Sequence, residues 1–133
     1  MSKPNSGNTI MFYPTISPGQ SVDYFWMASG GSTGLPANEI ITLNLKPTHL
    51  KAIKIRDAQT NSVPFLLTDV LQWGTAQWTT MDSMFLGCSN LNITATDVPD
   101  LSRVTDMFSM FSQCTILNGP ANINSWNTTN VTA

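Results

Sequence analysis

A repeat of 26 residues in the C-terminal half restricts what this chain can fold into more than any other feature. The matching pairs are Thr79 and Thr105, Met81 and Met107, Ser83 and Ser109, Met84 and Met110, Phe85 and Phe111, Cys88 and Cys114, Leu91 and Leu117, Asn92 and Asn118, and Ala95 and Ala121. A period of this length is typical of arrays in which each copy buries its apolar face against the next copy. A third, shortened copy begins at Trp126.

Each full copy carries apolar residues at positions i, i+3, i+4 and i+7. They are Met81, Met84, Phe85 and Cys88 in the first copy, and Met107, Met110, Phe111 and Cys114 in the second copy. This spacing predicts one face of a short helix, with Thr80 and Thr105 as N-caps and Gly87 near the end of the first helix. Short extended segments are expected after the helices, at Leu91 and Ile93 and again at Leu117 and Ile123. We therefore predict a repeat core made of Met81, Met84, Phe85, Cys88, Leu91, Met107, Met110 and Cys114.

The N-terminal half shows no repeat. Strand-like runs cover residues 9–13, 21–27, 39–45, 51–56 and 63–67, and Pro, Gly and Asn-Ser turns separate them. This pattern predicts a small antiparallel β domain over residues 1–65, which covers the start of a repeat domain over residues 66–133. The predicted fold class is α+β, with the β domain followed by a short leucine-rich-repeat-like β/α solenoid.

Four segments of the C-terminal half carry a resemblance to a known family. They are residues 72–81 (QWGTAQWTTM), 84–91 (MFLGCSNL), 97–107 (DVPDLSRVTDM) and 126–132 (WNTTNVT). Over roughly residues 66–133 the chain resembles the BspA-like leucine-rich-repeat surface proteins, which are bacterial proteins built of 26-residue repeats. The resemblance implies a role in adhesion or in binding to host surfaces, and it implies no catalytic residues.

Composition excludes several other classes of protein. Hydrophobic residues make up 41% of the chain, charged residues make up 11%, and the net charge is −2, which argues against disorder and against nucleic-acid binding. Every apolar run is shorter than the about 18–20 residues that span a bilayer, so no membrane span is expected. The polar N-terminus lacks the apolar stretch of a signal peptide. We expect a virion or an extracellular or cell-surface location.

Basic residues cluster in one part of the N-terminal half. Lys46, His49, Lys51, Lys54 and Arg56 lie within eleven positions. They are either a patch that binds an anionic ligand or the solvated face of a β hairpin, and we favour the hairpin face. His49 is the only histidine, and no spacing of ligands indicates a metal site or a cofactor.

Cys88 and Cys114 occupy equivalent positions in adjacent copies. They either form one disulfide, if their Cα atoms lie within about 7 Å, or serve as buried free thiols, and we favour the free thiols. The sequence contains no motif of a hydrolase, a P-loop or a dinucleotide site. We therefore expect a protein that is not an enzyme.

The incomplete third copy suggests how such a protein acts. A repeat array usually needs about three copies to bury its own core. We expect the open end of the array, with Phe111, Leu117, Ile123 and Trp126, to dock on a protein partner or on a second copy of the chain. The predicted function is therefore an exterior structural or interaction component, such as a virion structural or decoration protein. The alternative is a fragment of a bacterial adhesin that binds host or matrix ligands.

Overall fold

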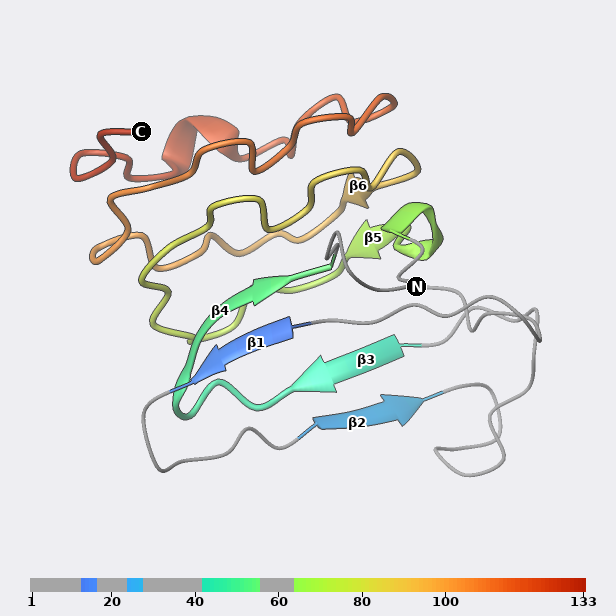
Figure 1. Ribbon diagram of the computed structural model, residues 1–133, viewed down its shortest axis with the longest axis horizontal. Coiled ribbons are helices and arrows are strands. Elements are labelled where there is room, and N and C mark those ends of the chain that lie inside the picture. Colours follow the sequence, from blue (N-terminus) through green and yellow to red (C-terminus); the bar gives the residue numbers. More distant parts are fainter. Residues whose placement is uncertain (1–12, 17–23, 28–41, 56–63) are drawn as a thin grey trace.

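The computed structural model describes residues 13–16, 24–27, 42–55 and 64–133, which form short strands followed by tight turns (Figure 1). The elements are β1 (Tyr13–Ile16), β2 (Tyr24–Met27), β3 (Thr42–Leu45), β4 (Leu50–Lys54), the 3-10 helix η1 (Pro64–Leu66), β5 (Asp69–Val70), β6 (Asn92–Ile93) and the 3-10 helix η2 (Ile123–Ser125). Strand β1 pairs with β4 and β2 pairs with β3, both antiparallel, whereas β5 and β6 pair in parallel.

The antiparallel pairs β1–β4 and β2–β3 agree with the antiparallel strands expected in the N-terminal half. The strand expected over residues 63–67 is wrong, because Pro64–Leu66 form η1 instead. Proline lacks the N–H group that a strand ladder needs and favours the start of a helical turn. Residues 9–12, 21–23, 39–41, 56 and 63 of the expected strands lie outside the described residues. The division at residue 65 into two domains stays a prediction.

The helices expected in the repeats are wrong. Over residues 81–88 the chain makes consecutive four-residue turns, in which the N–H groups of Met84, Leu86 and Cys88 donate to the carbonyls of Met81, Ser83 and Phe85. Ser83 has a φ of 55° and Gly87 has a φ of 80°. A right-handed helix needs negative φ at every residue, so these two positions exclude it.

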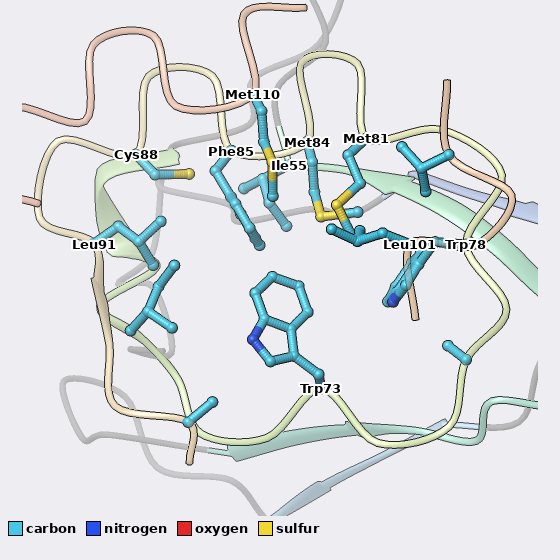
Figure 2. Close-up of a cluster of buried hydrophobic side chains, with 14 of the residues drawn as sticks. Ile55, Trp73, Trp78, Met81, Met84, Phe85, Cys88, Leu91, Leu101 and Met110 are labelled. Atoms are coloured by element: carbon cyan, nitrogen blue, oxygen red, sulfur yellow. The ribbon is translucent and has the colours of Figure 1, made fainter. Parts of the chain in front are cut away.

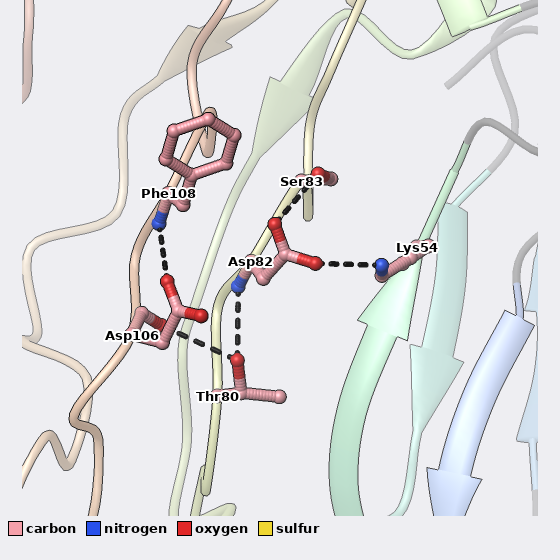
Figure 3. A network of polar contacts seen from close by, with 6 residues as sticks. All are labelled: Lys54, Thr80, Asp82, Ser83, Asp106 and Phe108. Carbon is pink, nitrogen blue, oxygen red and sulfur yellow. Dashed lines mark hydrogen bonds and ion pairs between the residues drawn. The ribbon is translucent and has the colours of Figure 1, made fainter. Parts of the chain in front are cut away.

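Thr80, one of the two expected helix caps, closes a local turn instead. The Thr80 hydroxyl accepts a hydrogen bond from the N–H of Asp82 at 3.1 Å and so closes a local turn. In the second copy the equivalent bond runs from the N–H of Phe108 to the carboxylate of Asp106 at 2.8 Å (Figure 3). Serine, threonine and aspartate begin tight turns by the same local hydrogen bonds that cap helices, so the sequence signal does not separate the two structures.

The predicted α+β class with a β/α solenoid is therefore wrong. In the described residues the only helices are η1 and η2, of three residues each, and each of the three sheets has two strands. The second copy has no strand where Leu117 and Ile123 were expected to lie in extended segments. The described C-terminal half is a series of irregular turns with one short strand pair, β5–β6, and one isolated bridge between Gln77 and Asp100.

The two repeat copies lie side by side and are joined by a regular series of backbone hydrogen bonds (Figure 1). The donors are the N–H groups of Met81, Ser83, Phe85 and Gly87, and the acceptors are the carbonyls of Asp106, Phe108, Met110 and Ser112, at 2.8 to 3.0 Å. Every bond in this series runs from a donor in the first copy to an acceptor in the second copy. The 26-residue repeat therefore sets the register between copies although no helix forms.

A single apolar core runs from β4 through the first copy to Trp126. Trp73 lies in its centre, with Met84, Phe85, Cys88 and Leu91 pointing into the same interior (Figure 2). The indoles of Trp73 and Trp126 meet edge to face, with ring centroids 5.3 Å apart. Aromatic contacts of this geometry add to the free energy that burial supplies.

Strand β4 covers the outer side of the first copy. The N–H of Thr79 donates to the carbonyl of Lys51 at 2.9 Å, and the N–H of Ile55 donates to the carbonyl of Met84 at 3.3 Å. The ammonium of Lys54 contacts the carboxylate of Asp82 at 2.8 Å (Figure 3). The first copy is thus enclosed between β4 on one side and the second copy on the other.

Candidate docking edge at the last repeat copy

Equivalent side chains of the two copies differ in exposure, and this difference defines the candidate site. Phe85 is 2% exposed and Cys88 and Leu91 are fully buried. Their counterparts Phe111, Cys114 and Leu117 are only partly buried and pack against the edge of the core. The residue types are the same, so the difference arises because the second copy covers the first, whereas nothing in the described part of the chain covers the second copy in the same way.

The backbone of the last copy shows the same asymmetry. In the first copy the N–H groups of Ser83 and Phe85 donate to the next copy. The equivalent N–H groups of Ser109 and Phe111 donate to no acceptor in the described part of the chain. Ser109 also repeats the positive φ of Ser83, at 54°. We use the name docking edge for the segment Met107–Leu117 with these two open donors.

The end of the chain already occupies the first position of this edge. The carbonyl of Ala133 accepts a hydrogen bond from the N–H of Met107 at 2.6 Å, as Asp106 does from Met81. The N–H of Thr132 donates to the carbonyl of Thr105 at 2.8 Å. Residues 131–133 therefore begin a third copy in the register of residues 104–106, and the open donors lie directly beyond them.

The four residues expected at the open end are not all on the docking edge. Phe111 and Leu117 lie on it and are partly buried. Ile123 is in η2 and is 43% exposed. Trp126 is buried against Trp73 of its own chain, so its indole does not contribute to an exposed end. Two exposed residues of the last copy, Phe108 and Ile116, were absent from the expected set.

The residues expected in the repeat core mostly have the expected burial. Met81, Met84, Phe85, Cys88, Leu91 and Met110 are buried, whereas Met107 and Cys114 are partly buried at the docking edge. The ring of Phe85 stacks on that of Phe111, with centroids 5.9 Å apart and planes 14° from parallel. Phe85 covers one face of the Phe111 ring, and the other face is the position where a ring from a further copy would stack.

Both cysteines are free thiols in this structure. Burial, with a smaller contribution from the neighbouring Cys114, raises the pKa of the Cys88 thiol to about 12. Burial also raises the pKa of Cys114, whose thiol donates to the carbonyl of Phe85 at 3.2 Å. Neither group has the lowered pKa of a nucleophilic cysteine.

The basic cluster is only partly assembled. Lys54 is engaged with Asp82, whereas Lys46 and His49 are exposed in the turn before β4. His49 and Lys51 line one small cavity together with Thr75 and Gln77. Arg56 lies outside the described residues. The hydrogen bond from Lys54 lowers the pKa of Asp82, with a further contribution from the Ser83 hydroxyl, so the described part of this cluster includes an internal ion pair.

A larger cavity of about 600 Å³ lies between β3, β4 and the first repeat copy. Its lining is mostly apolar and includes Leu45, Ile53, Trp73 and Trp78. Asp69 is the only charged side chain in the described lining, and its carboxylate accepts hydrogen bonds from the N–H and hydroxyl of Thr94. This lining offers no pair of groups for acid–base catalysis.

Sequence reasoning missed a set of polar side chains that join the repeat copies. Asp97 accepts hydrogen bonds from the N–H groups of Trp73 and Gly74 at 3.0 and 2.8 Å. The Asn122 amide donates to the carbonyls of Thr96 and Asp97. The only sequence signal for these contacts is the presence of Asp97 and Asn122, which lie 25 positions apart, close to the repeat period.

Within residues 13–16, 24–27, 42–55 and 64–133, no three His, Cys, Asp or Glu side chains converge to hold a metal ion. Over the same residues no helix has the length and apolarity to span a bilayer.

Comparison with known proteins gives one family. A family model described as "Mycoplasma protein of unknown function, DUF285" matches residues 54–133. No curated protein and no solved structure gives a significant match. The matched region begins in β4 and includes both repeat copies and the docking edge.

Proposed function

Because this chain belongs to the family described as "Mycoplasma protein of unknown function, DUF285", we propose that it is a non-enzymatic exterior protein that acts by self-association or docking. The docking edge of the last repeat copy is the surface that makes the contact. The location is a virion or a cell surface.

The observation that carries this proposal is the contrast between Phe85 and Phe111. Both occupy the same position of the repeat, but a neighbouring copy covers only Phe85. The apolar side chains of such an edge are unfavourable to leave in water, and its open backbone donors are a template for pairing with another chain. Natural proteins usually pair or cover such an edge. A protein partner supplies both the apolar cover and the hydrogen-bond acceptors.

An adhesin fragment is the second candidate function. It is favoured by the resemblance to BspA-like surface proteins and by the family, whose domains are found in such proteins. In this case the ligand is a host or matrix component. Capsid and tail genes beside the coding sequence would support the virion component, and an anchor or secretion signal in a longer reading frame would support the adhesin.

Sedimentation equilibrium over a wide concentration range, with and without candidate partner proteins, tests the docking proposal. We expect either concentration-dependent association or formation of a complex, with protection of the Phe111 amide in the associated state. A chain that stays monomeric at millimolar concentration and captures no partner would contradict the proposal.

A further inference from the structure

The turn before β4 holds a histidine in a backbone conformation that histidine does not favour. The N–H of Leu50 donates to the carbonyl of Pro47 at 3.1 Å, and His49, the third residue of this four-residue turn, has a φ of 68°. A turn with positive φ at its third position is of type II, which favours glycine or asparagine there. A histidine at this position costs backbone free energy, so its presence points to a use of the imidazole.

The imidazole faces a small cavity between the turn and the first repeat copy. The cavity has a volume of about 290 Å³, and Thr48, His49 and Lys51 line it on the side of the turn and β4. Thr75 and Gln77 line it on the side of the first copy. Because His49, Thr75 and Gln77 are exposed, a ligand can enter from solvent without displacing the core.

Hydrogen bonds outside the cavity fix its two sides. The N–H of Thr79 donates to the carbonyl of Lys51 at 2.9 Å, which ties the first copy to β4. The guanidinium of Arg103 donates to the side-chain oxygen of Gln77 at 2.9 Å. Since this bond engages the amide oxygen, the amide nitrogen is the group that Gln77 offers to the cavity, and it can only donate.

The polar groups around the cavity are matched to an anion. In the part of the lining that the structure describes, two side chains are basic and none is a carboxylate. The imidazole of His49 carries at least one N–H donor in either protonation state, and the hydroxyls of Thr48 and Thr75 can also donate. On the adjoining turn, the carboxylate of Asp100 accepts the N–H of Ser102 at 3.0 Å.

We propose that this cavity binds a tetrahedral oxyanion, that is, a phosphate or sulfate group, either free or as an ester of a small polar molecule. The ammonium of Lys51 supplies the charge, and His49, Thr75 and Gln77 donate to the oxyanion oxygens. Hydrogen bonds in which one partner is ionised are the stronger ones. This site goes beyond the proposed function and uses no residue of the docking edge, so the two stand or fall separately.

The site is narrower than the basic cluster of the sequence. Within the described part of that cluster, only His49 and Lys51 line the cavity. Lys54 is in the same strand as Lys51, but its ammonium contacts the carboxylate of Asp82 at 2.8 Å. The other donors come from the first repeat copy, more than twenty positions further along the chain. Lys54 therefore offers a matched control for Lys51.

The test is an NMR titration of the full chain with sodium phosphate, sodium sulfate and glucose 6-phosphate. Sodium chloride keeps the ionic strength at about 0.15 M, which screens general attraction between surface charges. We expect saturable shifts at the amides of residues 48–51 and 75–77. Tighter binding of glucose 6-phosphate than of inorganic phosphate would identify an ester as the ligand, and equal affinity would identify the free anion. No saturable shift with any of the three would overturn the proposal.

Two charge-removing variants separate a built site from general attraction. Lys51→Gln should weaken binding about tenfold, because it removes a charged donor. Lys54→Gln makes the same change of charge outside the lining and should weaken binding less than about twofold. Equal weakening by the two substitutions would overturn the proposal.

His49→Asn tests the imidazole without straining the turn. Asparagine tolerates positive φ better than histidine does, so the midpoint of urea unfolding should stay the same or rise. The affinity for glucose 6-phosphate should fall about fivefold, since one donor is lost. Unchanged affinity, whatever the midpoint, would assign His49 to the turn alone and overturn the proposal.

Discussion

The phenylalanines of the repeat give the sharpest quantitative test of the structure. Phe85 is 2% exposed, stacks on Phe111 and lies 6.1 Å from the ring of Trp73. Truncating a phenylalanine in such a site removes its burial and leaves a cavity, which costs about 3–5 kcal/mol of unfolding free energy. Phe85→Ala should therefore destabilise the chain by this amount.

Phe111→Ala should cost less, although the sequence alone predicts the same loss for both. The ring of Phe111 keeps its contact with Phe85 but has no further copy on its outer face. Phe111→Ala removes about half as much buried area as Phe85→Ala, so we expect a loss of unfolding free energy of about 1.5–2.5 kcal/mol. The control is Phe108→Ala, whose ring is 67% exposed and whose loss should be within about 0.5 kcal/mol.

Urea unfolding of the three variants, with the m-value held as a check on two-state behaviour, measures these losses. The expected order is Phe85→Ala, then Phe111→Ala, then Phe108→Ala. A loss below about 1 kcal/mol for Phe85→Ala would refute the assignment of this residue to the core. Equal losses for Phe85→Ala and Phe111→Ala in a monomeric chain would show that the last copy is already covered.

Three other predictions concern thiols, acid stability and the polar contacts between copies. Cys88 should react with a thiol reagent much more slowly than Cys114 in the native chain, because it is buried and its pKa is about 12; equal rates would contradict its burial. The pKa of Asp82 is below its ordinary value of 3.8, mainly through the hydrogen bond from Lys54, so this pair stabilises the fold above pH 3.8 and the effect is lost as pH falls through the lowered pKa. Asp82→Asn should therefore reduce the fall in unfolding free energy on the acid side of the pH–stability profile. The reduction should be at most about 1 kcal/mol, because the pair is partly exposed. An unchanged profile would contradict the pairing of Lys54 with Asp82. Asp97→Ala removes two hydrogen bonds to backbone N–H groups and should cost about 1–3 kcal/mol, measured by urea unfolding; a loss near zero would show that water replaces the carboxylate.

The burial of the repeat residues could be predicted from the sequence, but their backbone structure could not. Met81, Met84, Phe85 and Cys88 point into the core as their spacing predicts, yet they do so from consecutive tight turns. These turns bury the same four positions that a helix would bury. The residue that decides between the two is Ser83, and serine at positive φ carries no signature comparable to that of glycine.

The docking edge could be predicted in outline only. Phe111 and Leu117 lie on this edge and are partly buried. Trp126 was placed wrongly because its edge-on contact with Trp73 joins residues more than two repeat periods apart, and no local pattern reports such a contact. The direction of the hydrogen bonds between copies was also beyond the sequence, since it depends on which backbone groups the turns have already used.

Amide exchange at Phe85 and Phe111 in the dilute, monomeric chain tests the open docking edge most directly. Both residues follow a methionine, so their intrinsic exchange rates are closely matched. The N–H of Phe85 is bonded to the carbonyl of Met110, and that of Phe111 has no acceptor in the described part of the chain. We predict a large protection factor for Phe85, approaching that of global unfolding, and a protection factor on the order of 1 for Phe111. Equal, strong protection of both amides in the monomer would contradict the open edge and with it the proposed mode of docking.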